Sequence, residues 1–291
     1  MALLGAVEAG GTKFICAVAE QPDAPPIETI SIPTTMPAET IDRALDFFSR
    51  HELRALGIAS FGPIDLRVGS PSYGYITATP KAHWQNTDLV GPFQQAFNVP
   101  VGFDTDVNGA ALGELRYGGG QGLDSLVYVT VGTGIGGGAI TNGQVIHGLI
   151  HPEMGHIPVR RHPADTFVGA CPYHADCLEG MASGPSLIAR WGVAGDALPP
   201  THQAWEFEAY YLAQAVCSMV YLLSPQRIIL GGGVMHQRQL FEQIQHEVVQ
   251  TLKGYIQADA ITAHSDTYIM PPGLGDRSGA IGALELARLA G

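Results

Sequence analysis

The chain has 291 residues, of which 46% are hydrophobic and 14% charged, a composition that predicts a folded globular protein of about two domains and disfavours disorder. The formal net charge of -12 and the pI of about 5.2 are unfavourable for a nucleic-acid binder, whose affinity comes from neutralising phosphates. The sequence opens without a basic region or a long apolar run, and we find no window of about 18 apolar residues. We therefore expect no signal peptide and no membrane span, and a cytoplasmic location in which the four cysteines are reduced.

Taken in chain order, the expected elements alternate strands with helices. Strand pairs joined by Gly/Thr turns are expected at 3–18 and 126–141. Single strands are expected within 53–66, where the strand ends in a Gly-Pro turn, at 99–104, and in 227–234, where a short buried strand runs into glycines. Apolar residues at helical spacing predict helices at 38–51, from about Val107 to 115, and at 208–224, 240–252 and 278–290. This alternation predicts an α/β protein with two lobes and a cleft between them.

The two strand pairs resemble one another. "LLGAVEAGGTKFICAV" and "LVYVTVGTGIGGGAIT" each read as an apolar strand, a Gly/Thr turn and a second apolar strand. One copy opens each half of the chain, so the sequence predicts an internal duplication.

The glycine clusters predict phosphate binding. "GTGIGG", from Gly132 to Gly137, formally fits G-x-G-x-x-G, but the Asn142-Gly143 pair that follows predicts a hairpin rather than the helix that a dinucleotide fold requires. Gly lets backbone N–H groups approach anionic oxygens, and Thr adds a hydroxyl donor. A single turn of this kind is more simply a tight hairpin, but two related turns and a third cluster at 231–234 favour phosphate contacts.

A metal site is expected in "CPYHADC". Cys171, His174 and Cys177 offer three donors at successive spacings of three residues, and zinc prefers four such ligands in a tetrahedron. The fourth ligand must come from elsewhere, and His151, His156 and His162 are candidates. A Cys171–Cys177 disulfide and a set of solvated loop histidines are the alternatives, and both are disfavoured by the expected compartment and by the donor spacing.

Together these motifs resemble the ROK family of sugar kinases and repressors. The resemblance runs nearly end to end, through "EAGGTK", "DTDVNGAALGE", "VGTGIGGG", "HPEMGH", "CPYHADCLEG" and "GGGV". It implies the actin-like ATPase (ribonuclease-H-like) fold, with an N-terminal lobe at 1–115, a C-terminal lobe at 116–276 and a last helix, 277–291, that packs back on the first lobe. "FGPIDL", "TPKAHWQNTDLVG" and "GHIPVRRHP" look most like the bacterial fructokinase branch. The repressors carry a helix-turn-helix before the first phosphate loop, for which the residues before Glu8 leave no room.

The resemblance makes Asp106 the general base that accepts the proton of a sugar hydroxyl. The alternative is that Asp106 only caps the helix expected from Val107. Asp104, two residues earlier, is expected to be structural or orienting.

The resemblance also implies an ATP site and magnesium. Glu8 is a candidate for holding Mg²⁺ through water, although many relatives have Asp at this position. Lys13 is either a nucleotide contact or a solvated strand residue. The residues expected to contact the nucleotide are Gly10, Gly11, Thr12, Lys13, Gly132, Thr133, Gly134, Pro185, Gly231, Gly232 and Gly233.

For the zinc and sugar sites the resemblance selects His156 as the fourth zinc ligand. It also directs Glu153, His156 and Glu179 towards the sugar hydroxyls, the alternative for both carboxylates being a salt-bridged surface. Gly62 with Pro63, and Trp84, are weaker candidates for lining the sugar pocket. A zinc with four protein ligands has no open position, so its expected role is structural.

The expected function is ATP-dependent phosphorylation of a hexose, with fructose as the first choice. A kinase of relaxed specificity for glucose or mannose is the first rival, because sugar choice depends on few hydroxyl contacts. A non-catalytic, sugar-responsive regulator is the second. The resemblance further implies a homodimer.

Overall fold

The computed structural model describes residues 2–291 and divides into two compact units. The first comprises the chain up to Gln121, Val145–Pro152 and Arg277–Gly291; the second comprises Gly122–Gln144 and Glu153–Asp276. The sequence analysis placed the lobe boundary at 115/116, whereas the first unit runs to Gln121 and also includes Val145–Pro152. Side chains of that segment bond to residues near 64 and 104, as described below.

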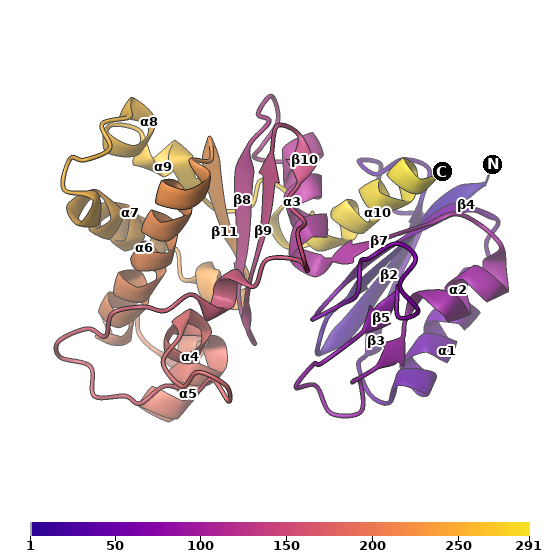
Figure 1. The fold of residues 1–291 in the computed structure, drawn as a ribbon, viewed down its shortest axis with the longest axis horizontal. Coiled ribbons are helices and arrows are strands. Elements are labelled where there is room, and N and C mark those ends of the chain that lie inside the picture. Colours follow the sequence, from indigo (N-terminus) through magenta and orange to yellow (C-terminus); the bar gives the residue numbers. More distant parts are fainter. Residues whose placement is uncertain (1) are drawn as a thin grey trace. The chain divides into compact units, whose positions relative to one another are not determined.

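The first unit is built on a five-stranded sheet in the order β3-β2-β1-β4-β7 (Figure 1). The sheet is mixed, because its central strand β1 pairs antiparallel with β2 on one side and parallel with β4 on the other. Nearly every residue of β1 and β4 is at least half-buried, as in a sheet covered on both faces. The strands are β1 Leu3–Ala9, β2 Lys13–Ala19, β3 Glu28–Pro33, β4 Leu53–Ser60 and β7 Val101–Thr105.

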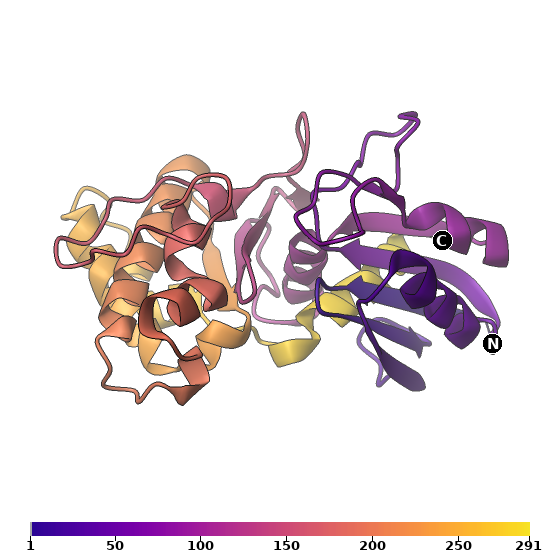
Figure 2. The same ribbon diagram turned by 90° about the horizontal axis from the view of Figure 1, so that it is seen from below.

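Helices cover this sheet. α1 (Pro37–Phe48) and α2 (Val90–Phe97) supply Phe47, Phe48 and Phe93 to the core cluster formed with β1, β2 and β4. The last helix, α10 (Ser278–Ala290), lies along β4 and β1 and against α3 (Asp106–Tyr117) (Figure 2). Glycines permit the close approach, since a Cβ at Gly57 or Gly282 would strike the backbone of the facing element. Two short strands, β5 (Tyr75–Ile76) and β6 (Thr87–Asp88), form a separate ribbon.

The second unit repeats the topology of the first. Its sheet has the order β10-β9-β8-β11-β12, with β8 antiparallel to β9 and parallel to β11. Each central pair is joined by a three-residue turn, 10–12 in the first unit and 132–134 in the second. The strands are β8 Leu126–Val131, β9 Ile135–Thr141, β10 Gln144–Val145, β11 Arg227–Gly231 and β12 Ile269–Met270. The predicted internal duplication is therefore confirmed.

Three α-helices of the second unit lie in the long segment between β10 and β11, and three more lie between β11 and β12. α6 and α7 pack on each other and carry the apolar faces that the sequence predicted. The α-helices are α4 Leu178–Ala182, α5 Gly184–Trp191, α6 Ala204–Leu223, α7 Gln239–Leu252, α8 Asp259–Thr262 and α9 Ser265–Tyr268. The 3₁₀ helices among residues 2–291 are η1 Met154–His156, η2 Gly195–Ala197, η3 Gly233–His236 and η4 Gly275–Arg277.

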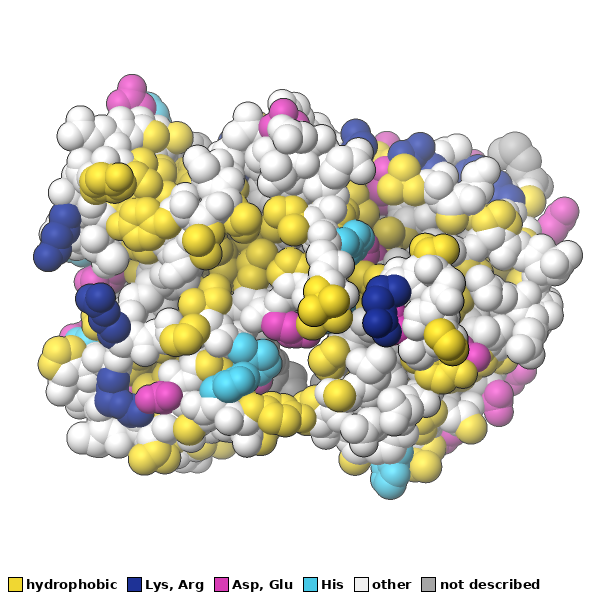
Figure 3. Space-filling view, viewed as in Figure 1, with side chains coloured by type: hydrophobic (Ala, Val, Ile, Leu, Met, Phe, Trp, Pro, Cys, Tyr) yellow, Lys and Arg dark blue, Asp and Glu magenta, His cyan; other side chains and the backbone are white. Residues whose placement is uncertain are grey.

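The hairpin reading of the second glycine cluster is confirmed. Asn142 and Gly143 both have positive φ, 52° and 71°, as a two-residue hairpin turn requires, and β9 precedes them where a dinucleotide fold would have a helix. None of the helices among residues 2–291 combines the length and the apolar composition needed to cross a membrane. On the face of the molecule drawn in Figure 3, Lys and Arg lie in small, separate groups.

Candidate active site and metal centre

Asp106 lies where β7 ends and α3 begins. The helix starts at Asp106 itself, one residue earlier than expected, and its N-cap is Thr105, whose hydroxyl accepts a hydrogen bond from the backbone N–H of Asn108 (3.1 Å). The alternative role of Asp106 as the N-cap is therefore wrong, although its Oδ1 accepts from the N–H of Val107 (2.9 Å). Burial raises the pKa of the Asp106 carboxyl to about 6, against smaller lowering effects from backbone hydrogen bonds. A carboxyl with such a pKa is suited to accept a proton near neutral pH.

Asp104 is buried beside it and holds the same junction together. Its Oδ1 accepts hydrogen bonds from the N–H of Thr105 and from Nδ2 of Asn108, both at 2.7 Å. Its Oδ2 lies 2.9 Å from Nε2 of His147. Asp104 therefore links the strand end, the first turn of α3 and the segment Val145–Pro152.

Val145–Pro152 also contacts the loop after β4. Nε2 of His151 accepts a hydrogen bond from the N–H of Ile64 (3.1 Å), and the imidazole ring lies against Gly62. Burial lowers the pKa of His151, so the neutral ring that accepts this bond is favoured. The sequence analysis assigned no role to His147, because no local pattern around this residue indicates its contact with Asp104.

The first glycine turn, 10–12, is held by its own sheet. The N–H of Gly10 donates to the carbonyl of Lys13 (3.0 Å), and the hydroxyl of Thr34 donates to the carbonyl of Gly10 (2.7 Å). Gly11, Thr12 and Lys13 are partly or fully exposed. The carboxylate of Glu8 lies against Gly279 in the first turn of α10, where the helix N-terminus favours negative charge.

The second glycine turn, 132–134, is held by the segment that follows the Cys/His loop. The N–H of Gly184 donates to the carbonyl of Gly132 (2.8 Å), which places Pro185, the next residue, beside the turn. Oε2 of Glu179 accepts from the N–H of Ile135 (3.0 Å). Thr133 at the tip is exposed.

The third cluster, 231–233, follows β11 and adjoins the second turn, because a Cβ at Gly132 would contact the N–H group of Gly233. Gly232 has φ +88°, and a Cβ there would strike the backbone of Val131, so this position requires glycine. The second unit thus brings together all its predicted nucleotide residues at the ends of two parallel strands, β8 and β11.

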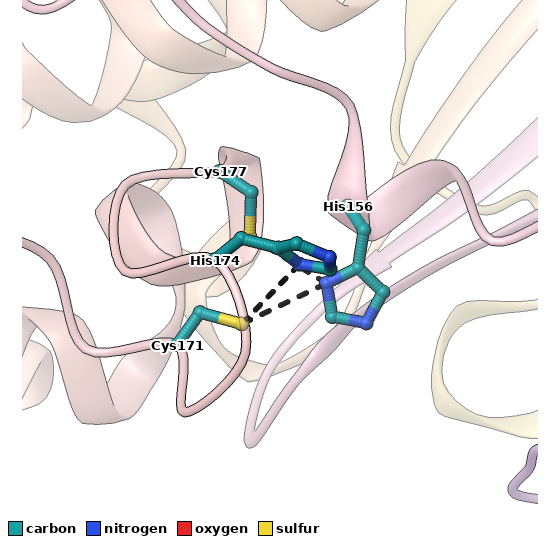
Figure 4. A group of neighbouring side chains, drawn as sticks. All are labelled: His156, Cys171, His174 and Cys177. Atoms are coloured by element: carbon teal, nitrogen blue, oxygen red, sulfur yellow. Dashed lines mark hydrogen bonds between the residues drawn. The ribbon is translucent and has the colours of Figure 1, made fainter.

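The side chains of the Cys/His cluster lie next to one another (Figure 4). Ligand atoms of His156, Cys171, His174 and Cys177 all lie within 4.8 Å of one another. Nδ1 of His156 lies 3.5 Å from Sγ of Cys177 and 3.8 Å from Sγ of Cys171, and Nδ1 of His174 also lies 3.8 Å from Sγ of Cys171. The nitrogen–sulfur edge of a tetrahedral zinc site is about 3.6 Å for ordinary Zn–N and Zn–S bonds. These distances and the donor types fit zinc.

The other two histidines considered as the fourth ligand lie elsewhere. His151 bonds to Ile64 in the first unit. His162 packs tilted against Phe207 and edge-on to Tyr210, with its Nε2 3.7 Å from Glu206. All four cysteines of the described chain are free thiols, so the structure has no Cys171–Cys177 disulfide.

A tight backbone turn presents three of these donors. The N–H groups of Cys171 and Ala175 donate to each other's carbonyls (3.2 and 3.0 Å), and the N–H of Ala170 donates to Gly180 (2.8 Å). Cys177 forms the N-cap position of α4, and burial raises the pKa of its thiol to about 11. A metal that binds here must displace the thiol proton.

The fourth donor comes from η1, which packs closely on β9. A Cβ at Gly155 would strike the carbonyl of Ile135, so glycine at this position lets η1 approach the strand. Glu153, at the start of η1, is exposed, while His156 is half-buried with Nδ1 directed at the sulfurs. The second unit therefore carries Glu153, His156 and Glu179 on adjoining short elements.

Trp84 does not line a pocket. Its side chain is fully buried, its indole N–H donates to the carbonyl of Thr35 (2.8 Å), and the ring packs on Phe14 and Phe61. Its expected place in the sugar pocket is therefore wrong. The sequence does not distinguish a tryptophan that packs in the core from one that lines a sugar pocket, because both positions favour an aromatic residue.

Comparison with known proteins places the architecture among the actin-like ATPases. A ROK family glucokinase from Streptomyces griseus, whose structure contains glucose and AMPPNP, superposes with a TM-score of 0.79 at 23% identity, covering 99% of each chain. The model of the ROK family matches residues 4–290, and the chain belongs to this family. A fructokinase of Pediococcus pentosaceus is 44% identical over 99% of this chain and 98% of its own length. A fructokinase of Zymomonas mobilis is also 44% identical, over 98% of this chain and 96% of its own length.

Proposed function

We propose that this protein is a fructokinase, which transfers the γ-phosphoryl group of ATP to the 6-hydroxyl of D-fructose. The observation that carries the proposal is the identity of 44% with two fructokinases over nearly the full length of the chain. The geometry of Asp106 adds a chemical reason, since a phosphoryl acceptor needs a base at its hydroxyl.

Asp106 accepts the proton of the 6-hydroxyl as the oxygen attacks the γ-phosphorus. Asp106 is the first residue of α3, and the N–H of Val107 orients its carboxylate by donating a hydrogen bond to Oδ1. Its raised pKa makes it a stronger base than a surface aspartate while leaving it ionised at neutral pH. Most of the remaining catalysis is positioning and charge neutralisation at the phosphates.

The glycine turns hold the nucleotide. In the second unit, the exposed turn at Thr133 and the glycines at 231–233 offer backbone N–H groups and a hydroxyl to the phosphates and ribose, with Pro185 beside them. In the first unit, Gly10, Gly11 and Thr12 offer a second exposed turn. Magnesium, when bound, neutralises phosphate charge; Glu8 supplies an oxygen acceptor of the type that Mg²⁺ prefers, acting through water.

Zinc in the Cys/His cluster is structural in this proposal. Four protein donors at tetrahedral spacing leave no position for water or substrate. His156 directs Nδ1 at the sulfurs, so its Nε2 is the nitrogen available for a sugar hydroxyl. Glu153 and Glu179 supply acceptors, Glu179 with the carboxylate oxygen that does not meet Ile135, and Gly62 supplies a surface without a side chain. In this proposal the fructokinase is cytoplasmic and acts as a homodimer. Light scattering of the purified protein checks the oligomeric state.

A panel of hexoses tests the proposal. ADP release is measured with fructose, glucose, mannose and N-acetylated sugars, against a blank without sugar that reports ATP hydrolysis alone. We expect kcat/KM for fructose to exceed that for glucose by at least about tenfold, because a hydroxyl mismatch leaves buried polar groups unpaired. A product with phosphate on a carbon other than C6, by ³¹P NMR, contradicts the assigned acceptor. Equal rates on glucose and mannose establish the relaxed kinase instead, and no ADP release with any sugar supports the regulator.

A further inference from the structure

The segment Val145–Pro152 is attached to the first unit at both ends by histidines. His147 bonds to Asp104 at one end, and His151 accepts from the N–H of Ile64 at the other. Between them, the N–H of Gly148 donates to the carbonyl of Ile150 (3.0 Å), and Leu149 is 87% exposed. The tip is therefore solvated. One end is bonded to Asp104, two residues before the proposed catalytic carboxylate, and the other end is bonded to the loop after β4.

The His147–Asp104 pair differs from an ordinary surface ion pair. The Asp104 side chain is only 5% exposed, so its carboxylate has lost most of its water and depends on protein donors. Two donors serve Oδ1, and His147 serves Oδ2. An ionised carboxylate only accepts, so Nε2 of His147 carries the proton in this bond.

The same carboxylate sets the geometry of the first turn of α3. Oδ1 of Asp104 holds the N–H of Thr105, the residue directly before Asp106, and the amide of Asn108, two residues after it. Thr105 in turn caps the helix through the N–H of Asn108. An Asp104 side chain that rotates loosens both contacts on either side of Asp106.

We propose that His147 is a positioning residue for phosphoryl transfer: by fixing the buried Asp104 carboxylate, it holds Asp106 at the angle needed to take the proton of the sugar hydroxyl. This inference rests on the fructokinase proposal. His147 touches neither substrate in it and acts through Asp104; its Nε2 also lies 3.4 Å from Nδ2 of Asn108, which is a donor and cannot accept the Nε2 proton.

The first test is a kinetic comparison of His147→Ala, His147→Gln and Leu149→Ala, with Leu149→Ala as the control for disturbance of the same segment. Loss of the donor from a buried acceptor is expected to lower kcat about tenfold or more, because small misplacements of a base cost large factors. KM for ATP is expected to change less than about threefold, since the nucleotide is assigned to the glycine turns. Gln carries an N–H donor on a side chain of similar reach and is expected to recover most of the loss. A kcat within about twofold of wild type for His147→Ala, or no recovery by Gln, overturns the proposal.

A double-mutant cycle then separates action through Asp104 from direct action on the sugar. In the Asp104→Ala background, His147→Ala is expected to have no further effect on kcat. An undiminished effect in that background shows that His147 acts by another route. If Asp104→Ala does not fold, the same cycle in the Asp104→Asn background decides the question.

Hydrogen exchange at residues 101–110 tests the positioning without turnover. His147→Ala is expected to speed the exchange of the N–H groups of Thr105 and Asn108, and Leu149→Ala is not. A wild-type protein that phosphorylates no hexose refutes the fructokinase proposal, while this exchange still reports whether His147 holds the junction. Unchanged exchange in His147→Ala overturns the positioning role whatever the activity.

Discussion

The two three-residue glycine turns occupy the same place in a repeated topology but are stabilised in different ways. In the first unit, Thr34 of the neighbouring β3 end holds the 10–12 turn through its hydroxyl and its N–H group. In the second unit, Glu179 and Gly184, which follow the Cys/His loop, hold the 132–134 turn. The duplicated copies have thus diverged in what supports them: the sheet in one, an inserted loop in the other.

In the proposed enzyme, the two units have different roles. The first unit carries the acid–base group, set by hydrogen bonds among Asp104, Thr105 and Asn108. The second unit carries a nucleotide turn that is held by Glu179 and Gly184, which follow the metal ligand Cys177 in the chain. Perturbing Asp106 should therefore remove chemistry alone, and perturbing the cluster should remove stability and nucleotide binding together.

The largest expected effect is that of Asp106→Asn. General-base catalysis contributes about 10²–10⁴-fold, so kcat should fall by that factor. The amide can still accept from Val107, so the melting temperature and the zinc content should stay those of the wild type. Coupled ADP release, calorimetry and metal analysis measure the three quantities; a turnover near that of the wild type removes Asp106 from the role of base.

Zinc removal is expected to act on the second unit. Chelation, or Cys177→Ser, should cost about 3 kcal/mol or more of stability, which corresponds to a fall of roughly 6–12 °C in melting temperature for a domain of this size. Cys217→Ser is the matched control, because Cys217 is equally buried but lies on α6 outside the cluster.

The same variant tests the link to the glycine turn. Loss of the metal should raise KM for ATP and speed hydrogen exchange at 132–135, with exchange at 10–13 unchanged. Protein purified without chelator that contains no stoichiometric zinc would refute the metal assignment itself.

Much of this arrangement could be predicted from the sequence, because local patterns carry it. The alternation of apolar residues gave both strand pairs, and the spacing of Cys171, His174 and Cys177 indicated three donors within one tight turn. The fourth donor could not be derived from spacing alone, since three histidines were candidates and tertiary packing of η1 on β9 decides among them.

What the sequence did not indicate depends on contacts between distant segments. Nothing near His147 shows that it meets Asp104, 43 residues away, and the placement of Val145–Pro152 in the first unit follows from that contact. Trp84 was misassigned for a related reason, because burial in a core and exposure in a pocket require the same apolar residue. Short helices such as α4 and α5 have too few turns for a periodic pattern.

The pH dependence sharpens the assignment to the first unit. With a pKa of about 6 in the free enzyme, Asp106 is the protonated, inactive acid below that value and the active base above it. We expect kcat/KM for fructose to rise tenfold per pH unit on the acid side and to level off above about pH 7. The residual activity of Asp106→Asn should lack this limb. A limb that survives unchanged in the variant belongs to another group.

The smallest expected effect compares buried carboxylates of the two units. Glu285 in the first unit accepts from Tyr117 and Arg288, whereas neither oxygen of the fully buried Glu208 has a hydrogen-bond partner among the described residues. Burial raises the pKa of Glu208 well above its usual value, against a smaller lowering by Arg190. The folded state therefore holds this proton after the unfolded chain has released it, so the stability contributed by Glu208 is complete below about pH 4.5 and falls as the pH rises towards the raised pKa.

Glu208→Gln removes this loss and should stabilise the protein at neutral pH, with no gain near pH 4. Glu285→Gln, the matched variant, should instead destabilise it, because Gln cannot keep the charge-assisted bonds to Arg288. Urea unfolding of both variants at pH 4.5 and 7.5 measures the difference. A Glu208→Gln variant that is less stable at pH 7.5 would show that Glu208 is ionised and paired with Arg190 in the folded state.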